Sequence, residues 1–309
     1  MQRGSAGGQV LRLGAITDEI SDRLERSLDL LNEWGLQDVE IHTLWGSSIE
    51  RLEAGEVERL TQLLDEHGLR TCMLSSTVFL RCRILDGPLP AAWDRRFDSI
   101  PGTYTDHVAA LSRCLETAAA LGAPLVRVFG FWPEEGNPAA LGEEVVTRLC
   151  DAADLAARHG IALALENCPH SQLDHTRKVL EVLEAVHSPW LRLLWDPSNA
   201  WRCGERDLVG LIDRAMPHLA HMHLKGIRLG GGHAAGRTYV PLDEGEIDYR
   251  QLLGGVLSAG YSGVFSLEPH YALPRTGREG AARESLTRLR RLLDGLPQVD
   301  TSAAWSDVG

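Results

Sequence analysis

Paired cysteines are missing from this chain, since none of its six cysteines belongs to a C-x-x-C motif. Their scattered positions predict reduced, unpaired thiols, as in the cytosol, rather than the disulfide framework of a secreted protein. Long apolar runs are also missing: no stretch approaches the length of a membrane span, and residues 1–8 contain no hydrophobic signal core. We therefore expect a cytoplasmic protein that does not associate with membranes.

Positive charge is scarce as well. The 309 residues include 31 Lys and Arg against 43 Asp and Glu, which gives a formal net charge of -12. Because a surface that binds phosphates must be basic, this balance argues against a nucleic-acid partner. The chain also has no P-loop and no G-x-G-x-x-G after its first apolar run, so the usual nucleotide signatures of an open doubly wound sheet are absent.

What the sequence does contain is a regular alternation of short apolar runs and amphipathic segments. It predicts strands at 10–16, 39–42, 70–75, 124–129, 161–165, 191–195, 219–223 and 263–267. It predicts helices at 21–34 (capped by Ser21), 57–67, 106–121, 141–159, 175–186, 208–216, 249–259 and 279–293. Such alternation implies parallel strands, and eight units match the size of a single (β/α)8 TIM barrel of the α/β class.

The same pattern divides the chain. We predict a disordered N-terminus at 1–8, the barrel at 9–295 and a C-terminal tail at 296–309. Two connections, 76–103 and 226–245, are longer than ordinary strand-to-helix loops. Both would lie on the rim where a substrate enters, and the first is either a lid or a partner-contact segment.

Four consecutive predicted strands, the fifth to the eighth, end on side chains that bind metals. They are Glu166 in L-E-N, Asp196 in W-D-P-S-N, His223 in H-M-H-L-K-G and Glu268 in S-L-E-P-H. Taken singly, each is more often a helix cap or a rim residue. In a barrel, however, these strand ends converge, and three carboxylates would repel each other without a cation between them. This oxygen and nitrogen set suits Mn²⁺, Mg²⁺, Co²⁺ or Zn²⁺.

The seventh predicted strand offers two histidines. His221 and His223 lie on the same face because successive side chains of a strand alternate. His223 lies nearer the rim and is the predicted ligand, while His221 is predicted to be a packed interior residue or a support for the ligands.

These motifs resemble those of the sugar phosphate isomerase/epimerase superfamily, the xylose isomerase-like TIM barrels. The resemblance covers nearly the whole chain and includes Thr17-Asp18-Glu19 after the first strand and Gly245-Glu246-Ile247-Asp248, which is similar to the family's G-x-G-x-I-D-Y. It implies one divalent metal ion, with Mn²⁺ as the first choice, held at the four positions named above. The second histidine of H-x-H is the ligand in this pattern.

The resemblance also implies an enzyme of carbohydrate metabolism. The function expected first is an isomerase or epimerase that acts on a sugar, keto-sugar or polyol. In the ketose 3-epimerases of the superfamily, the residues matching Glu166 and Glu268 remove and return a proton beside a carbonyl, through an enediolate stabilised by the metal.

Several polar and aromatic residues near strand ends are candidates for substrate binding. They are His42, His170, Asn199, Lys225, Arg228 and Trp132. Three of them have a simpler alternative: Lys225 and Arg228 as solvent-facing charges, and Trp132 as a core residue.

Departures from the family narrow the function. Asn199 replaces the histidine of the D-x-x-H found in endonuclease IV, and Gly236-Arg237-Thr238 stands where its D-x-H would fall, so DNA repair is disfavoured. The K-D that often follows the metal histidine is Lys225-Gly226 here.

Two other functions stay open. One is a metal-dependent lyase, similar to inosose dehydratase or to a C-glycoside deglycosidase, that eliminates a β leaving group from a keto-sugar. The other is a non-catalytic barrel that acts as a partner subunit. Family analogy also allows a homo-oligomer.

Overall fold

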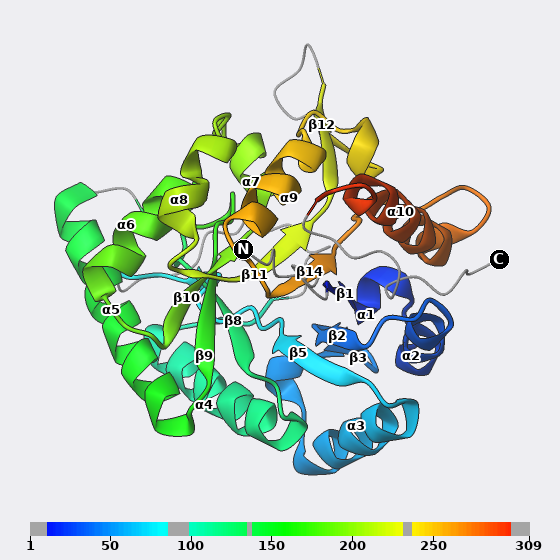
Figure 1. The fold of residues 1–309 in the computed structure, drawn as a ribbon. Helices are drawn as coiled ribbons and strands as arrows, with labels where there is room; N and C mark the ends of the chain where they lie inside the picture. The colour runs from blue at the N-terminus through cyan, green and yellow to red at the C-terminus, as the bar shows by residue number, and fades with distance from the viewer. Residues whose placement is uncertain (1–10, 86–98, 135–137, 231–236, 298–309) are drawn as a thin grey trace, which may run out of the picture.

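The computed structural model describes residues 11–85, 99–134, 138–230 and 237–297, and within them the chain forms a closed barrel of eight parallel strands (Figure 1). The strands, in barrel order, are β1 (Arg12–Ile16), β2 (Asp38–Ile41), β5 (Arg70–Leu74), β8 (Leu125–Phe129), β9 (Ala162–Glu166), β10 (Leu191–Trp195), β11 (Leu219–Leu224) and β14 (Val264–Leu267). β14 pairs with β1 and closes the barrel. The predicted single (β/α)8 fold is confirmed, and all eight predicted strands are present. The predicted disordered N-terminus lies outside the described residues, and so does nearly all of the predicted tail.

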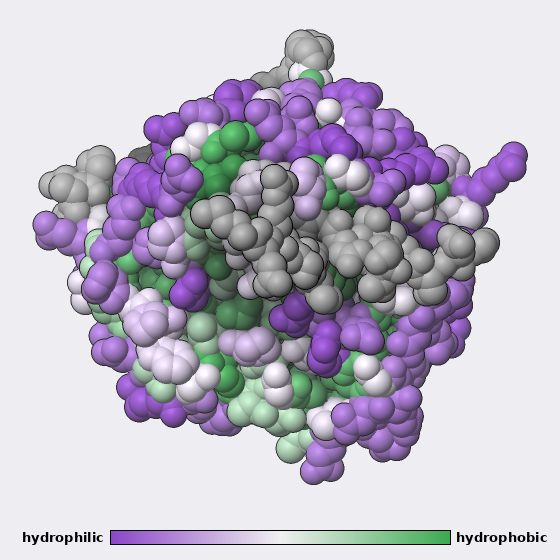
Figure 2. Space-filling view, viewed as in Figure 1, coloured by the Kyte–Doolittle hydropathy of each residue, from purple (hydrophilic) through white to green (hydrophobic). Residues whose placement is uncertain are grey.

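Helices surround the barrel on its outside (Figure 1). The longer ones are α2 (Leu24–Glu33), α3 (Ala54–His67), α4 (Tyr104–Leu121), α5 (Pro138–His159), α6 (Thr176–Val186), α9 (Tyr249–Ser258) and α10 (Gly277–Leu293). Their apolar faces and the outer faces of the strands form one large core. Gly68 and Gly122 end α3 and α4 in the left-handed conformation, with φ of 64° and 65°. Hydrophilic residues accordingly cover most of the periphery, and apolar residues show nearer the middle of the face in Figure 2.

Short elements occupy the connections. Those in the first half are α1 (Thr17–Ile20), β3 (Thr43–Leu44), β4 (Ser47–Ser48), η1 (Ile49–Arg51), β6 (Arg81–Cys82) and β7 (Pro101–Gly102). Those in the second half are α7 (Pro197–Arg202), η2 (Val209–Leu211), α8 (Ile212–Ala215), β12 (Gly226–Leu229), β13 (Arg237–Val240) and η3 (Leu242–Glu244). No helix among the described residues is both long and apolar enough to cross a membrane.

Two helix predictions were wrong in detail. Ser21 does not cap the first long helix, because its backbone N–H closes the separate turn α1 by donating to the Thr17 carbonyl at 3.2 Å, and α2 begins only at Leu24. The predicted helix 208–216 is instead the 3-10 turn η2 followed by the short α8.

The hairpin of β12 and β13 accounts for the glycine that replaces the family's aspartate after Lys225. The two strands are antiparallel, with Gly226 opposite Val240. A Cβ atom at Gly226 would lie 2.3 Å from the Val240 carbonyl oxygen and 2.5 Å from that of Pro241. Only glycine lets the backbone turn away from β11 so close to these carbonyls.

We therefore expect Gly226→Ala to destabilise the protein by about 1–3 kcal/mol, because the added methyl group overlaps backbone atoms that cannot move freely. Chemical denaturation followed by circular dichroism measures this. Gly142→Ala is the matched control: Gly142 lies in α5 with nothing within 4 Å of its added Cβ. This variant should gain about 0.5–1 kcal/mol. Equal stability of the two variants would contradict the assignment of Gly226.

Candidate metal centre

The ends of four neighbouring strands bring the four predicted ligands together. Glu166 ends β9, Asp196 directly follows β10, His223 lies in β11 and Glu268 directly follows β14. One ligand atom from each lies within 4.8 Å of the others, and all four side chains are buried. Because β9, β10, β11 and β14 are consecutive in the barrel, the ligands form an arc with a glutamate at each end.

Strand geometry explains why they meet. Ala164 and Leu194 pack with Met73 in a small cluster that is separate from the large core beneath the helices. Side chains of a strand alternate, so Glu166 and Asp196, each two residues further along, point into the barrel above this apolar layer.

Asp196 also begins a helix that the sequence pattern did not predict. Its Oδ1 accepts a hydrogen bond from the backbone N–H of Asn199 at 2.8 Å and so caps α7, with Pro197 at the first helical position. The cap holds the carboxylate in place and leaves Oδ2 facing the other ligands.

Both oxygens of Glu166 are held. The Asn199 amide donates to Oε1 at 2.9 Å, and Nη1 of Arg127 donates to Oε2 at 3.3 Å. Arg127 lies in β8, is itself buried, and donates to the carbonyl oxygens of Ser75 and Ser76 at 3.0 Å. Burial raises the pKa of Glu166 in spite of this nearby guanidinium. A fixed carboxylate with a raised pKa is suited to proton transfer.

Lys225 lies against two of the ligands. Its Nζ is 2.6 Å from Asp196 Oδ2 and 2.5 Å from Glu268 Oε2, and the residue is only 3% exposed. Burial lowers the pKa of an ammonium group, but here the two carboxylates outweigh burial and hold the pKa of Lys225 well above its usual value. The solvent-facing alternative for Lys225 is therefore excluded.

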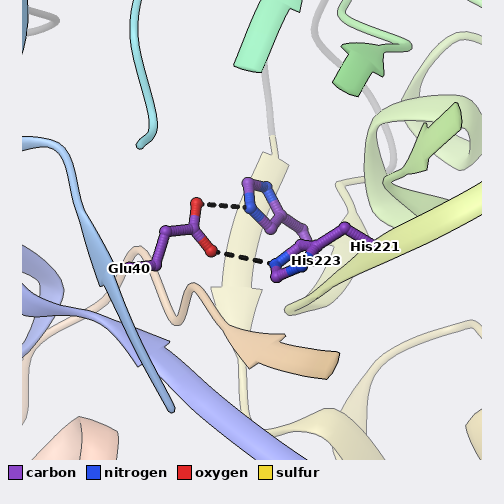
Figure 3. Close-up of side chains that lie close together, drawn as sticks. All are labelled: Glu40, His221 and His223. Carbon is purple, nitrogen blue, oxygen red and sulfur yellow. Dashed lines mark hydrogen bonds and ion pairs between the residues drawn. The ribbon is translucent and has the colours of Figure 1, made fainter. Parts of the chain in front are cut away.

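His223 is held from across the barrel by a carboxylate that the sequence analysis missed. Glu40, in β2, accepts from Nε2 of His223 at 2.8 Å and from Nε2 of His221 at 3.0 Å (Figure 3). Burial would raise the pKa of Glu40, yet the two imidazoles hold it well below the usual range. His221 is thus the supporting interior residue that the strand pattern suggested.

The free nitrogen of His223 faces the other ligands. Nδ1 lies 3.4 Å from Glu268 Oε2 and 3.9 Å from Glu166 Oε1, and it has no hydrogen-bond partner among the described residues. Burial opposes protonation of His223, but Glu40 and Glu268 outweigh it and hold its pKa well above the usual value. The surroundings of this nitrogen therefore attract positive charge.

Charge balance within the cluster fits a divalent cation. With His223 neutral, as a metal ligand must be, four buried carboxylates, those of the three acidic ligands and Glu40, face two buried cations, Arg127 and Lys225. Unpaired buried charge is strongly unfavourable, and one divalent ion matches the excess of two negative charges. The oxygen and nitrogen donors are those that Mn²⁺, Mg²⁺, Co²⁺ and Zn²⁺ accept.

The Thr17-Asp18-Glu19 motif holds two histidines at the edge of this cluster. Asp18 Oδ2 lies 3.0 Å from Nδ1 of His42, a predicted substrate contact that is half-buried. Glu19 Oε1 lies 2.7 Å from Nδ1 of His270, whose Nε2 is 3.4 Å from Glu268 Oε1. His270 therefore contacts a ligand directly.

The remaining predicted substrate contacts are less buried than the ligands. Trp132 is half-buried, and its backbone N–H donates to the Cys82 carbonyl at 2.8 Å. His170 and Arg228 are exposed, and Arg228 donates to the carbonyl of Glu244 at 2.7 Å. Of the six residues predicted to bind substrate, Asn199 and Lys225 contact the ligand cluster: Asn199 donates to Glu166, and Lys225 lies against Asp196.

Backbone strain gathers in the loops that follow the strands. Four bulky residues there have positive φ: Trp45 after β2, Phe79 after β5, Phe131 after β8 and His270 after β14. Such conformations are unfavourable for large side chains and are enriched at functional sites. They lie in loops at the end of the barrel where the ligands converge.

The fold and this arrangement define a xylose isomerase-like TIM barrel. The model of that family matches residues 28–292, and the chain belongs to the family.

Among its relatives is L-ribulose-5-phosphate 3-epimerase UlaE of Salmonella paratyphi C, which is 25% identical over 122 residues. The match covers 39% of this chain and 40% of that epimerase, so it spans about two fifths of either protein.

Solved structures of similar fold cover nearly the whole chain. The IOLI protein with a bound zinc atom superposes with a TM-score of 0.73 at 18% identity, over 93% of this chain and 99% of that one. AsbF of Bacillus anthracis, named as a probable 3-DHS dehydratase, has a TM-score of 0.66 at 19% identity, over 91% and 98%.

Chelation of divalent ions should lower the melting temperature, because the carboxylates then lose the charge that compensates them. Saturation at 100 times Kd stabilises a fold by about 2.7 kcal/mol. Calorimetry with EDTA and then with excess Mn²⁺ measures the shift. Asp196→Asn is the control. Asparagine still caps α7 but is a weaker metal ligand, so this variant should show a smaller change in melting temperature. If neither EDTA nor Mn²⁺ changes the melting temperature of the wild-type protein, the proposed metal centre is wrong.

Proposed function

We propose that this protein is a divalent-metal-dependent isomerase or epimerase that acts on a sugar, keto-sugar or polyol. One observation carries the proposal: two buried glutamates, Glu166 and Glu268, end the arc of ligands on either side of Asp196 and His223. A substrate carbon held over this arc would have a carboxylate on each side. The partial match to a 3-epimerase supports the same reaction class.

A divalent ion at these ligands would supply a Lewis acid that polarises a carbonyl oxygen and so acidifies the neighbouring C–H bond. Mn²⁺ is our first choice, with Mg²⁺, Co²⁺ and Zn²⁺ as alternatives. The substrate we propose is a small molecule. The predicted cytoplasmic location, and the absence of nucleic-acid and membrane partners, stay predictions.

The two glutamates have different hydrogen-bond and ion-pair partners, which suggests separate roles in proton transfer. Glu166 is fixed by Asn199 and by Arg127, a group that stays charged at any accessible pH. Glu268 contacts Lys225 and His270, and His270 is partly exposed. We infer that each glutamate exchanges a proton with the reacting carbon from its own side, one removing it and the other returning it.

Lys225 is the side chain best placed to bind a developing oxyanion. Its ammonium group already lies among the ligand carboxylates, and burial strengthens its field. An enediolate formed beside the glutamates would gain from this charge.

Elimination is the second candidate. The observation that favours it is the pair of His270 and Glu19, at 2.7 Å, next to Glu268. Burial lowers the pKa of His270, but Glu19 outweighs it and raises the pKa, so the imidazolium is available to protonate a leaving hydroxyl. Proton removal by a glutamate would then lead to loss of water rather than to reprotonation.

Glu166→Gln and Glu268→Gln should each reduce turnover by roughly 10²–10⁴-fold, because an amide cannot accept the proton. NMR of a panel of ketoses and ketose phosphates in D2O, with Mn²⁺, detects deuterium at the carbon beside the carbonyl and any product formed. Deuterium incorporation together with formation of an epimer or isomer supports the first function, whereas formation of a dehydrated product supports elimination.

Glu50→Gln is the matched control for that experiment. Glu50 is equally buried, but it bonds Thr77 away from the ligands, so this variant should keep the activity. Full activity in both Glu166→Gln and Glu268→Gln would refute proton transfer by these residues.

Lys225→Met should change metal binding and turnover in opposite directions. Loss of the ammonium group removes a positive charge beside Asp196 and Glu268. The Kd for Mn²⁺ should therefore fall roughly tenfold, which is about 1.4 kcal/mol of binding free energy. kcat/KM should fall because the oxyanion loses its partner. Competition with a fluorescent chelator measures the first quantity and steady-state kinetics the second. Weaker Mn²⁺ binding would show that Lys225 supports the centre in another way.

A further inference from the structure

Glu40 lies inside the barrel, on the side opposite to the ligand arc. It is fully buried in β2, and β14 and β1 separate its strand from β11 in the barrel order. Its carboxylate nevertheless spans the interior: Oε1 contacts Nε2 of His223, and Oε2 contacts Nε2 of His221 (Figure 3). The Ser75 hydroxyl donates to Oε1 as well. One side chain thus joins two histidines that are far from it in the sequence.

Irregular strand pairing accompanies this contact on both sides. The register between β2 and β5 shifts by one residue at Val39/Glu40, and that between β10 and β11 shifts at Leu193/Leu194, beside His221. Shifts of this kind turn side chains and are common next to functional sites. Here they occur at Glu40 itself and at the residue of β10 that pairs with His221.

The contact determines where the hydrogens lie. An ionised carboxylate only accepts hydrogen bonds, so each Nε2 must carry a hydrogen, and an imidazole in its neutral form then has its lone pair on Nδ1. For His223, that lone pair faces Glu166 and Glu268 at 3.9 and 3.4 Å. This is the form of histidine that binds a metal through Nδ1.

We propose that Glu40 is a positioning residue of the metal centre: by accepting both Nε2–H groups, it selects the tautomer of His223 that binds the metal through Nδ1 and fixes the plane of the ring. The inference depends on the metal centre proposed above and adds a residue to it. The alternative, a second metal ion held by Glu40, His221 and His223, would need lone pairs on the same nitrogens that hydrogen-bond to Glu40.

The wild-type protein provides the first test. Zn²⁺ titration should give one ion per chain, and ¹⁵N-histidine NMR of the Zn²⁺-loaded protein should show His223 with a metal-bound Nδ1 and a protonated Nε2. The His221→Phe variant assigns the two rings. Coordination through Nε2, or two bound ions per chain, would overturn the proposal. This test needs no change at Glu40 and stands if Glu40 variants fail to fold.

Glu40→Gln provides the second test. A glutamine has one acceptor and one donor group, so only one of the two histidines keeps its Nε2–H contact. Mn²⁺ affinity, measured by chelator competition, should fall roughly 10–100-fold, as for other carboxylates behind metal-binding histidines. The visible spectrum of the Co²⁺-loaded protein should also change, which a purely structural role would not cause.

Glu50→Gln is again the matched control, because it removes a buried carboxylate that does not contact the histidines. It should keep wild-type affinity and the wild-type Co²⁺ spectrum. If wild-type protein binds no metal, the proposed centre itself fails. If wild-type protein binds one ion and Glu40→Gln binds it equally well with the same spectrum, only the role of Glu40 is refuted.

Discussion

Buried negative charge is the constraint on which the rest of this structure depends. Four carboxylates converge inside a closed barrel, where each would be strongly unfavourable without a partner. Arg127 and Lys225 compensate part of this charge, and the amide of Asn199 donates a hydrogen bond to Glu166. The remainder fits a divalent cation, so the residues that would be unfavourable in the interior on their own are those that make it a candidate metal centre.

The barrel gathers these carboxylates because of where its strands end. The ligands follow or end β9, β10, β11 and β14, and below them lies an apolar layer that includes Ala164 and Leu194. Strained loop residues surround the same end, and the hairpin after Lys225 turns away through a glycine that no larger residue can replace without a clash. Membership of the xylose isomerase-like family agrees with this arrangement, in which the barrel supplies the scaffold and the C-terminal ends of its strands carry the polar site.

The proposed chemistry follows from an asymmetry within the cluster. Glu166 contacts a guanidinium and an amide, whereas Glu268 contacts an ammonium group and a histidine near the surface. Two carboxylates of the same kind are thereby placed in different environments on either side of one position, an arrangement suited to moving a proton from one face of a carbon to the other.

The sequence by itself determined the fold and pointed to the four candidate ligands that the barrel brings together. Alternating runs specify parallel strands and helices, and a polar residue directly after an apolar strand, as at Glu166 or Asp196, marks a strand end that a barrel brings to its rim. These are local signals, read within a few residues of one another. A charged residue inside a buried strand, such as Glu40, is also visible in the sequence, but its partner is not.

Only the tertiary structure decided those partnerships. Glu40 and His223 are 183 positions apart, and Arg127 meets Glu166 over 39 positions, so no spacing in the chain encodes either contact. Likewise, Lys225 directly follows β11, a position where a lysine often faces solvent. Its burial against Asp196 and Glu268, which follow β10 and β14, is evident only in the folded barrel. The physical reason is closure of the barrel: it places opposite walls within hydrogen-bond distance, and a buried charge then takes whichever counter-charge the far wall provides.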